Sequence, residues 1–439
     1  MADFWMKLPF LLNIELIQLA EEGCDVSAFK SEVADLTGDV SPVEKMLALY
    51  ERLSHLQPHP SFPYIEPSDL EGIRQARSQT VAVPTAQIPD ERLKDHILGA
   101  WLGRCAGCTL GKPVEGFTRQ QVETYLGAAG AYPLADYVPL IDPIPAGIQL
   151  HPSFVDTVRG RISYMSRDDD TDYTIIGLHV LEKYGPQFTS ADVGETWLDV
   201  LPYQMVFTAE RMAYRNLVNE LPIPETARFH NPCREWIGAQ IRADGFAYAA
   251  AGNPRLAAEL AFRDAALTHV KNGIYGEMLA AAMIAKAFTT TDVYAIIQAG
   301  LDEIPQQSRL AEAVRQVLAW KKDCPQWTDA FERIAQEYSK YFWVHTINNA
   351  ALVLMSLLYG DGDLAKSISI AVMAGWDTDC NGATVGSILG AMLGAKDLPQ
   401  AWISPLNDTL HSAVFGFDQT RISDLALRSW KTYRAVKAG

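Results

Sequence analysis

The chain has 439 residues, of which 48% are hydrophobic and 21% are charged, and its formal net charge is −16. This composition is typical of a folded globular protein with one large domain or several average ones, and it excludes wholesale disorder. The net negative charge argues against a nucleic-acid backbone as partner and favours metal ions or a compact polar ligand.

The first 85 residues are predicted to form a helical appendage that ends in a proline-rich linker. Apolar residues recur at three-to-four spacing over 9–23 and 41–56, a pattern typical of helices. Residues 57–69 then contain four prolines, which favour an extended loop. We therefore divide the chain into an appendage over 1–85 and a main domain over 86–439.

The N-terminal apolar run lacks a basic region and a small-residue cleavage site, so we do not expect a signal peptide. No apolar stretch is long enough to span a membrane, so a membrane partner is not expected either. Among the six cysteines only Cys105 and Cys108 are close, and the absence of a second pair favours buried thiols over a zinc site. Sparse cysteines are typical of a reducing compartment, and we expect a cytoplasmic protein.

From residue 92 onward the apolar residues recur with helical spacing, and alternating strand patterns are scarce. The predicted fold class is therefore all-α, a compact bundle of many helices. Residues 132–154 are the main interruption, because five prolines there favour a long irregular loop. This loop directly precedes the most acidic segment of the chain, so we expect it to form a wall of a binding cleft.

Two acidic segments each stand at the start of a predicted helix. Residues 166–174 contain four aspartates, and the second segment contains Asp377 and Asp379. Such charges either face solvent at a helix N-terminus, where the helix dipole stabilises them, or bind a hard divalent cation, and the residues alone leave both interpretations open. Two such helix starts could together form a box of oxygen ligands for Mg²⁺, Mn²⁺ or Ca²⁺.

Glycine recurs at every fourth residue in two segments, which places the glycines of each segment along one helix face. The two series are Gly99, Gly103, Gly107 and Gly111, and Gly382, Gly386, Gly390 and Gly394. Each interior glycine costs a helix roughly 1 kcal/mol relative to alanine, so packing must compensate. We predict that these faces allow close approach of helix backbones in the centre of the bundle and hold the acidic helix starts in register.

In these segments the chain resembles a divergent member of the ADP-ribosylglycohydrolase family, which includes dinitrogenase reductase-activating glycohydrolase and the ADP-ribosyl-acceptor hydrolases. The resemblance covers residues 92 to 395 and rests on the segments 103–115 (GRCAGCTLGKPVE), 168–171 (DDDT), 268–273 (THVKNG) and 375–380 (GWDTDC). It implies an all-helical domain that binds two divalent cations, Mg²⁺ or Mn²⁺.

The resemblance also implies roles for individual residues. The implied metal ligands are Asp168, Asp169, Asp170, Asp377 and Asp379, and the implied catalytic residues are Asp169 and Glu115. The candidate substrate-binding residues are Trp376, Cys380, His269, Gly238, Arg242 and Asn348. For His269 and Asn348 the alternative is a packing role, and Trp376 could equally stack on a base or pack in the core.

The chain departs from the family pattern at several positions. Asp168 stands where the family has Ser or Thr, Cys380 stands at a second hydroxyl position, and Trp376 stands where the family has glycine. Because sulfur suits Mg²⁺ poorly, either Cys380 is not a ligand or Mn²⁺ is tolerated there. Residues 235–242 keep Gly238 and Arg242 but lose a G-N-G that holds phosphates in the family, which weakens the case for a diphosphate.

The predicted function is metal-dependent hydrolysis of a ribosyl C1–N or C1–O bond in an ADP-ribosyl or related nucleoside substrate, carried by a small molecule or a modified protein. Two cations would hold ribose hydroxyls and orient a water, and Asp169 or Glu115 would act as general base or stabilise the transition state. Two alternatives stay open, namely a two-metal hydrolase of phosphate esters and a homologue that binds a ligand without catalysis.

Overall fold

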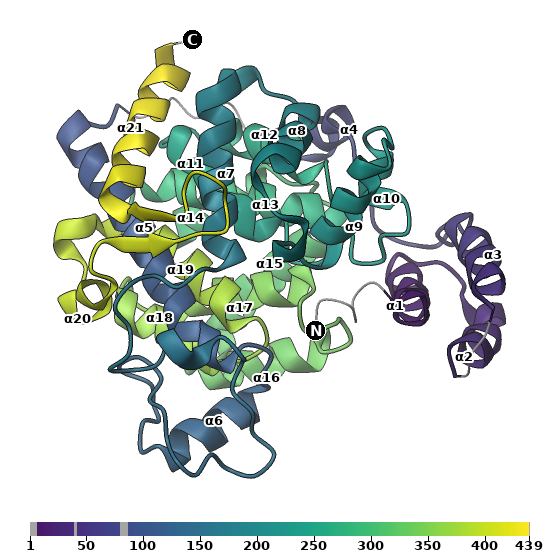
Figure 1. Cartoon of the computed structure of the whole chain (residues 1–439), viewed down its shortest axis with the longest axis horizontal. Helices are drawn as coiled ribbons and strands as arrows, with labels where there is room; N and C mark the ends of the chain where they lie inside the picture. The colour runs from purple at the N-terminus through teal and green to yellow at the C-terminus, as the bar shows by residue number, and fades with distance from the viewer. Residues whose placement is uncertain (1–6, 39–41, 80–86, 439) are drawn as a thin grey trace.

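The structure is a computed structural model that describes residues 7–38, 42–79 and 87–438. Helices make up most of it, which confirms the predicted all-α class (Figure 1). In the described ranges the regular sheet is one antiparallel pair, β1 (Thr409–His411) and β2 (Gln419–Arg421), in which Leu410 lies opposite Thr420. None of the described helices is long and apolar enough to cross a membrane.

The N-terminal helices are α1 (Leu8–Glu21), α2 (Lys30–Gly38), α3 (Val43–Ser54) and α4 (Leu70–Ala76). Helices α1 to α3 lie together at one side of the molecule, purple in Figure 1, and pack around their own cluster of buried apolar side chains, which Met212 of the main body joins. Between α3 and α4, where the sequence predicts the proline-rich linker, the chain forms no helix. The predicted boundary between residues 85 and 86 lies outside the described residues.

The main body surrounds two central helices, α5 (Asp90–Gly111) and α19 (Thr378–Leu393). The helices between them in sequence are α6 (Arg119–Ala128), α7 (Asp169–Tyr184), α8 (Ser190–Val200), α9 (Thr208–Val218), α10 (Glu225–Arg228), α11 (Asp244–Ala249), α12 (Pro254–Ala265), α13 (Lys271–Ala287), α14 (Val293–Asp302), α15 (Arg309–Asp323), α16 (Trp327–Tyr338), α17 (Thr346–Tyr359) and α18 (Leu364–Met373). After α19 follow α20 (Gln400–Ile403) and α21 (Ile422–Ala438).

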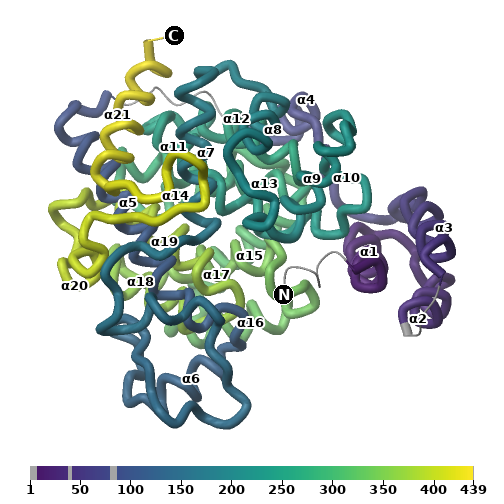
Figure 2. Tube along the Cα trace, viewed as in Figure 1, coloured from purple at the N-terminus to yellow at the C-terminus, as the bar shows by residue number. Residues whose placement is uncertain are grey.

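The two glycine series face each other where α5 and α19 lie side by side (Figure 2). A Cβ on Gly103 would lie 2.1 Å from the carbonyl oxygen of Gly386, and a Cβ on Gly386 would lie 2.0 Å from that of Gly103. The same reciprocal contact joins Gly99 with Gly390 and Gly107 with Gly382. The predicted close approach of backbones is therefore confirmed, and each series is the partner of the other.

This contact sets the end of α5 beside the start of α19. The hydroxyl of Thr378, the first residue of α19, donates a hydrogen bond of 2.8 Å to the carbonyl oxygen of Gly111, the last residue of α5. After Gly111 the chain continues through a short 3-10 helix, Lys112–Val114, to Glu115. As a result, Lys112 and Glu115 lie next to the acidic start of α19.

The predicted irregular loop is present between α6 and α7, where residues 129–153 contain neither helix nor strand. The backbone N–H of His151 donates a 3.0 Å hydrogen bond to the carbonyl oxygen of Pro113, which anchors the loop to the segment after α5. Ser153, at the end of the loop, lines a small cavity together with Lys112 and Asp168. The loop therefore borders a cavity of about 10 Å³ next to the acidic segment, and its role as the wall of a binding cleft stays a prediction.

Buried ion pairs hold the appendage to the main body. Arg234 pairs with Glu15 at 2.9 Å and with Glu22 at 2.8 Å, and Arg309 pairs with Glu66 at 2.8 Å. Removing one partner from such a pair is costly, because it leaves an uncompensated charge inside the protein. The contact between appendage and main body is therefore sensitive to single substitutions.

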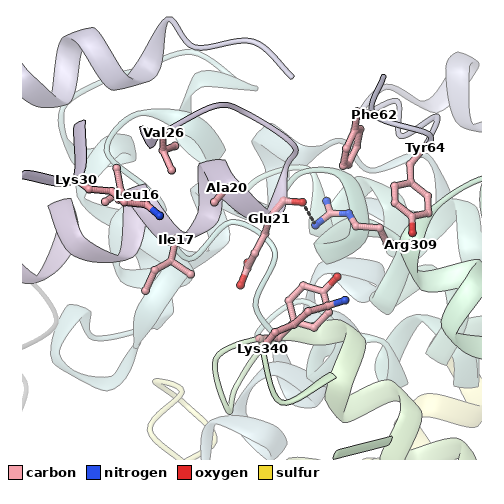
Figure 3. A pocket seen from close by; sticks show the side chains of 11 residues that line it. Leu16, Ile17, Ala20, Glu21, Val26, Lys30, Phe62, Tyr64, Arg309 and Lys340 are labelled. Atoms are coloured by element: carbon pink, nitrogen blue, oxygen red, sulfur yellow. Dashed lines mark hydrogen bonds between the residues drawn. The ribbon is translucent and has the colours of Figure 1, made fainter. Parts of the chain in front are cut away.

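A cavity of about 500 Å³ lies beside this network (Figure 3). Leu16 and Ile17 of α1 line it on one side, and Phe62 and Tyr64 line it on another. At its edge, Nη1 of Arg309 donates a 3.0 Å hydrogen bond to the backbone carbonyl oxygen of Glu21. None of the sequence-predicted site residues lines this cavity.

The Glu21 carboxyl is expected to make the stability of the folded protein depend on pH. Burial, and next the negative charge of Glu235, raise its pKa from 4.5 to about 8, against the opposing effect of Arg309; His345 Nε2 also lies 3.6 Å from Glu21 Oε2. A carboxyl whose pKa is raised on folding contributes stability below pH 4.5, and this contribution is lost as the pH rises through 8. We expect this group to remove roughly 3 kcal/mol between pH 5 and pH 9.

Glu21→Gln is expected to remove that part of the pH dependence, because the amide does not titrate. Urea unfolding at pH 5 and pH 9 measures the change in unfolding free energy for wild type and variant. Glu71→Gln on α4 is the matched control, since Glu71 is exposed to water. A Glu21→Gln protein whose stability falls as steeply as that of wild type would contradict the expectation.

Candidate active site

The first acidic segment is buried at the start of α7. Asp168 is the N-cap of this helix, and its Oδ1 accepts a 3.0 Å hydrogen bond from the backbone N–H of Asp170. Asp168 and Asp170 are at most 1% exposed, so these two do not form a solvated helix start. Asp172 is used differently, because it pairs with Arg167 at 2.8 Å and accepts hydrogen bonds from the segment after β1.

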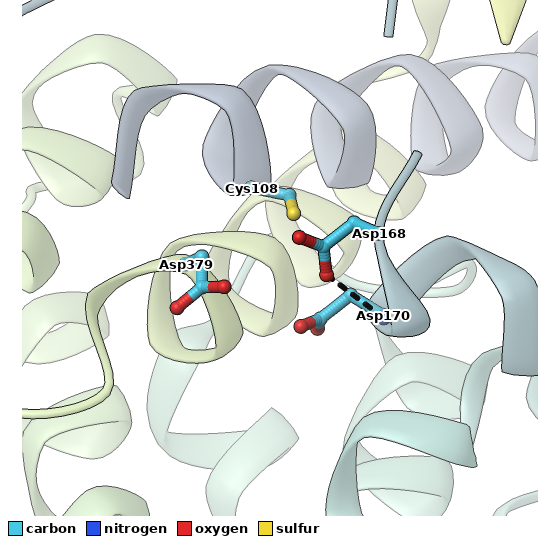
Figure 4. Close-up of side chains that lie close together, drawn as sticks. All are labelled: Cys108, Asp168, Asp170 and Asp379. Atoms are coloured by element: carbon cyan, nitrogen blue, oxygen red, sulfur yellow. Dashed lines mark hydrogen bonds between the residues drawn. The ribbon is translucent and has the colours of Figure 1, made fainter. Parts of the chain in front are cut away.

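Four side chains from three helices converge in a carboxylate and thiol cluster (Figure 4). They are Cys108 of α5, Asp168 and Asp170 at the start of α7, and Asp379 of α19, and one ligand atom of each lies within 4.8 Å of the others. Asp377, Asp379 and Cys380 form a second group with the same spacing. Asp379 belongs to both groups, so the two acidic helix starts are brought together as the sequence predicts.

Lys112 inserts its ammonium group into this cluster. Its Nζ donates hydrogen bonds of 2.8 Å to Glu115 Oε2 and 3.0 Å to Asp379 Oδ2. It also lies 2.7 Å from Asp168 Oδ2, away from the ideal hydrogen-bond direction, and we count this contact as an ion pair. Burial opposes the charge of Lys112, but the three carboxylates outweigh it and hold the pKa of Lys112 well above its usual range.

Arg104 of α5 connects Asp170 of the cluster to Asp244 at the start of α11. This fully buried residue donates to the backbone carbonyl oxygen of Asp170 at 2.8 Å and to its Oδ1 at 3.0 Å. It also pairs with Asp244 Oδ2 at 2.8 Å. The other carboxylate oxygen of Asp170 accepts the thiol of Cys380 at 3.2 Å. Asp170 is thereby held by α5 and α19 together.

Most carboxyl groups of the site carry raised pKa values, but that of Asp168 is lowered, because the charge of Lys112 outweighs the effect of burial. Burial, and next the charge of Asp168, raise the pKa of Asp169 to about 7. Burial and the charge of Asp379 raise the pKa of Glu115 to about 8 and that of Asp377 well above its usual range. A bound cation would lower all three values, because it would compensate the crowded negative charge.

The donor set fits a hard divalent cation. Oδ1 of Asp379 is buried and has no hydrogen-bond partner among the described residues, although a buried carboxylate oxygen is normally satisfied. Burial raises the pKa of the Cys108 and Cys380 thiols well above the usual range, so both are protonated and are poor metal ligands. The carboxylate oxygens are therefore the donors that a cation would use, and they suit Mg²⁺ or Mn²⁺.

Three predicted substrate-binding residues lie together in a separate buried network. The guanidinium of Arg242 donates to Glu210 Oε1 at 2.6 Å and to the hydroxyl of Thr268 at 2.9 Å. His269 Nδ1 lies 2.6 Å from the same hydroxyl, and a Cβ on Gly238 would lie 2.2 Å from Glu210 Oε1. Among the contacts of the described residues, none joins this network to Asp168, Asp170 or Asp379 by a hydrogen bond or ion pair.

The remaining predicted residues differ in place. Asn348 is fully buried and donates a 3.1 Å hydrogen bond to the carbonyl oxygen of Phe342 just before α17. Trp376 is half-buried, and its backbone N–H donates a hydrogen bond to the carbonyl oxygen of Phe117. The φ of Trp376 is 63°, a left-handed conformation that costs a bulky residue energy. Its ring lies 6.0 Å from that of Phe331, so Trp376 is beside the site and packs on α16.

Sequence reasoning missed Lys112, Arg104 and His151. Lys112 and Arg104 both lie in the segment 103–115, where a charged residue among glycines and apolar residues was the available signal. His151 Nε2 lies 3.6 Å from Glu115 Oε2, and burial together with the charge of Lys112 lowers its pKa. No local pattern points to His151, because its contact depends on the path of an irregular loop.

Comparison with known proteins gives one family. Residues 89–438 match the family model of the ADP-ribosylglycohydrolases. Among curated proteins no match is found. A solved structure described as "ADP-ribosylglycohydrolase-related protein complex" is similar to this chain at 20% sequence identity with a TM-score of 0.48, over 79% of this chain and 99% of that one.

Proposed function

Because the chain belongs to the ADP-ribosylglycohydrolase family, we propose that it hydrolyses a ribosyl glycosidic bond at the carboxylate cluster. The observation that carries the proposal is the convergence of buried carboxylates from the start of α7 and the start of α19 on one place, with Asp379 Oδ1 left without a partner. The substrate would be an ADP-ribosyl or related nucleoside compound, either a small molecule or a modified protein.

We propose that Asp377 and Asp379, together with the aspartates at the start of α7, hold Mg²⁺ or Mn²⁺. When bound, such a cation polarises ligand hydroxyls and makes water a stronger nucleophile near neutral pH. Cys380 supports the ligands without binding the metal, because its protonated thiol donates to Asp170. The family match and the unpaired oxygen of Asp379 support this assignment.

Asp169 and Glu115 are proposed to move protons. The pKa of Asp169 is about 7 without a cation, and a bound cation would lower it, so the carboxylate is ionised at neutral pH as a general base requires. Of the two, Glu115 holds its proton more readily, because its pKa of about 8 in the cation-free protein exceeds that of Asp169, so we assign it as the general acid for the leaving group. His151, 3.6 Å from Glu115, and Lys112, 2.8 Å from it, would hold Glu115 in place.

The buried network of Arg242 bears on the substrate. Because its guanidinium is buried and each of its nitrogens already has a hydrogen-bond partner, Arg242 is not available to a diphosphate. We therefore propose a ribosyl substrate that this residue does not hold through a diphosphate, with Trp376 at the edge of the site. We also propose that 86–439 is the catalytic domain and 1–85 an appendage, a division that the family match from residue 89 supports.

Asp377→Asn tests the proposed site. We expect hydrolysis to fall about 100-fold or more, since the amide supplies neither the charge nor the ligand strength of a carboxylate. Wild type and variant are assayed with Mn²⁺ against ADP-ribosyl and ribosyl N- and O-glycosides, with free ribosyl product and inorganic phosphate measured separately. Burial already raises the pKa of Asp377, so the amide is expected not to unfold the protein.

Asp292→Asn is the matched control, because Asp292 is an exposed aspartate at the start of α14 that caps this helix through a side-chain oxygen. It should hydrolyse at the wild-type rate. Release of inorganic phosphate without ribosyl product would favour the phosphate-ester alternative. An Asp377→Asn protein with wild-type hydrolysis and wild-type metal binding would rule out this site.

A further inference from the structure

The ammonium group of Lys112 lies inside one of the two groups of candidate ligands. Nζ is 2.7 Å from Asp168 Oδ2 and 3.0 Å from Asp379 Oδ2, and both carboxylates belong to the group that Cys108 and Asp170 complete. A third carboxylate, Glu115, contacts the same nitrogen at 2.8 Å. Carboxylates from three segments of the chain therefore share one fixed positive charge.

The contact lengths suit an ammonium nitrogen. Distances of 2.7 to 3.0 Å are those of direct contact between an ammonium nitrogen and a carboxylate oxygen. Bonds from Mg²⁺ to oxygen measure about 2.0–2.1 Å, so an ion bound by Asp168 and Asp379 together would have to displace Nζ from between them. The side chain is only 12% exposed, so the surrounding protein resists such a displacement.

The second group of candidate ligands has no such internal cation. Asp377 forms no ion pair with a lysine or arginine in the described parts of the chain, and the groups that act on it most are Asp379, Glu115 and the thiol of Cys380. Asp379 turns Oδ2 toward Lys112 and leaves Oδ1 buried without a partner. Asp379 thus has one oxygen bound to the Lys112 ammonium and one oxygen that remains open to a cation.

We propose that Lys112 substitutes for one of the two metal ions, so that Asp168 pairs with Lys112 instead of a metal, and the site binds a single divalent cation at Asp377 and Asp379 instead of the two that the family resemblance implies. The proposal rests on the proposed function only in that the carboxylate cluster binds a divalent cation. Lys112 then provides the positive charge of a second ion at all times, whatever the concentration of metal.

The stoichiometry of Mn²⁺ binding tests this proposal. Calorimetric titration of the full chain with MnCl₂, checked by metal analysis after gel filtration, should give one ion per wild-type chain. Lys112→Met should bind two, because the uncharged side chain frees Asp168 and Asp379 Oδ2 for a second ion. Lys112→Arg keeps the charge and should bind one. In electron paramagnetic resonance, wild type should show an isolated Mn²⁺ and Lys112→Met a spin-coupled pair.

Lys271→Met is the matched control, because Lys271 is a half-buried lysine that pairs with Glu22 at 2.6 Å away from the cluster. It should bind one ion, like wild type. Two ions per wild-type chain would overturn the proposal even if Lys112→Met failed to fold, and one ion in both proteins would overturn it as well. No ion in either protein would overturn this proposal and the cation-dependent form of the proposed function together. One ion in a wild type that hydrolyses nothing, with two in Lys112→Met, would count against the proposed function alone.

Discussion

Gly107→Ala is expected to destabilise the protein by about 3–5 kcal/mol, or to prevent its folding, although it adds a single methyl group. The new Cβ would lie 1.9 Å from the carbonyl oxygen of Gly382 and 2.4 Å from its carbonyl carbon. Both atoms are backbone, so no side-chain rotation can relieve the clash, and α5 and α19 would have to separate. Separation would open the centre of the core, where close packing makes each lost contact count.

Gly127→Ala is the matched control for this prediction. Gly127 is also a helical glycine, in α6, but a Cβ there would meet nothing within 4 Å. This variant should be as stable as wild type or up to about 1 kcal/mol more stable, because alanine favours the helix and restricts the unfolded chain. Urea midpoints measured for both variants give the comparison. Equal stabilities would show that the glycine contact is not tight.

How far the fold follows from the sequence is clear at this contact. A glycine at every fourth residue determines which face of each helix is bare, and it predicts close backbone approach. The spacing does not say which helix supplies the other backbone, because any bare face would serve. In the structure the other backbone belongs to the second glycine series, Gly382 and its neighbours, which lies more than 270 residues further along the chain.

The site shows the same division between local and distant information. Asp168, Asp170 and Asp379 could be placed from the sequence, because each stands at a helix start with a recognisable pattern. His151 could not, since its position depends on the path of an irregular loop. Arg242 and His269 matched by motif, but the role of Arg242 depends on Glu210 and Thr268, and these two pairings come only from the packing of α9, α12 and the segments beside them.

The role of Lys112 depends on both local and distant information. Its position in the chain, three residues before Glu115, is local, but the consequence depends on two carboxylates that arrive from α7 and α19. A lysine next to one glutamate is ordinary at a protein surface. The same lysine among three buried carboxylates changes how much positive charge the site has left to take up, which is a property of the assembled fold.

Arg104→Met is expected to be the most damaging charge substitution near the site, with a cost of about 3–5 kcal/mol and a loss of hydrolysis. The variant leaves the carboxylates of Asp170 and Asp244 buried without their shared cation, and it removes the Arg104 donor from the carbonyl oxygen of Ile241, while that of Asp170 keeps its hydrogen bond from the Thr174 hydroxyl. Asp170 would then no longer be held against α5, so the carboxylates at the start of α7 would lose their position relative to Asp379.

The pH dependence of the lost stability shows whether buried charge or packing causes the loss. Without Arg104, burial would raise the pKa of both carboxyls further, so the stability deficit should be smallest at pH 5 and should grow as the pH rises and the folded state resists their ionisation. Adding Asp244→Asn should recover part of the loss, because one of the two stranded charges is then neutral. Arg428→Met is the matched control, since Arg428 pairs with Glu182 at the surface and should cost less than about 1 kcal/mol. A deficit that is the same at pH 5 and pH 8 would mean that Arg104 acts through packing and not through the buried charges.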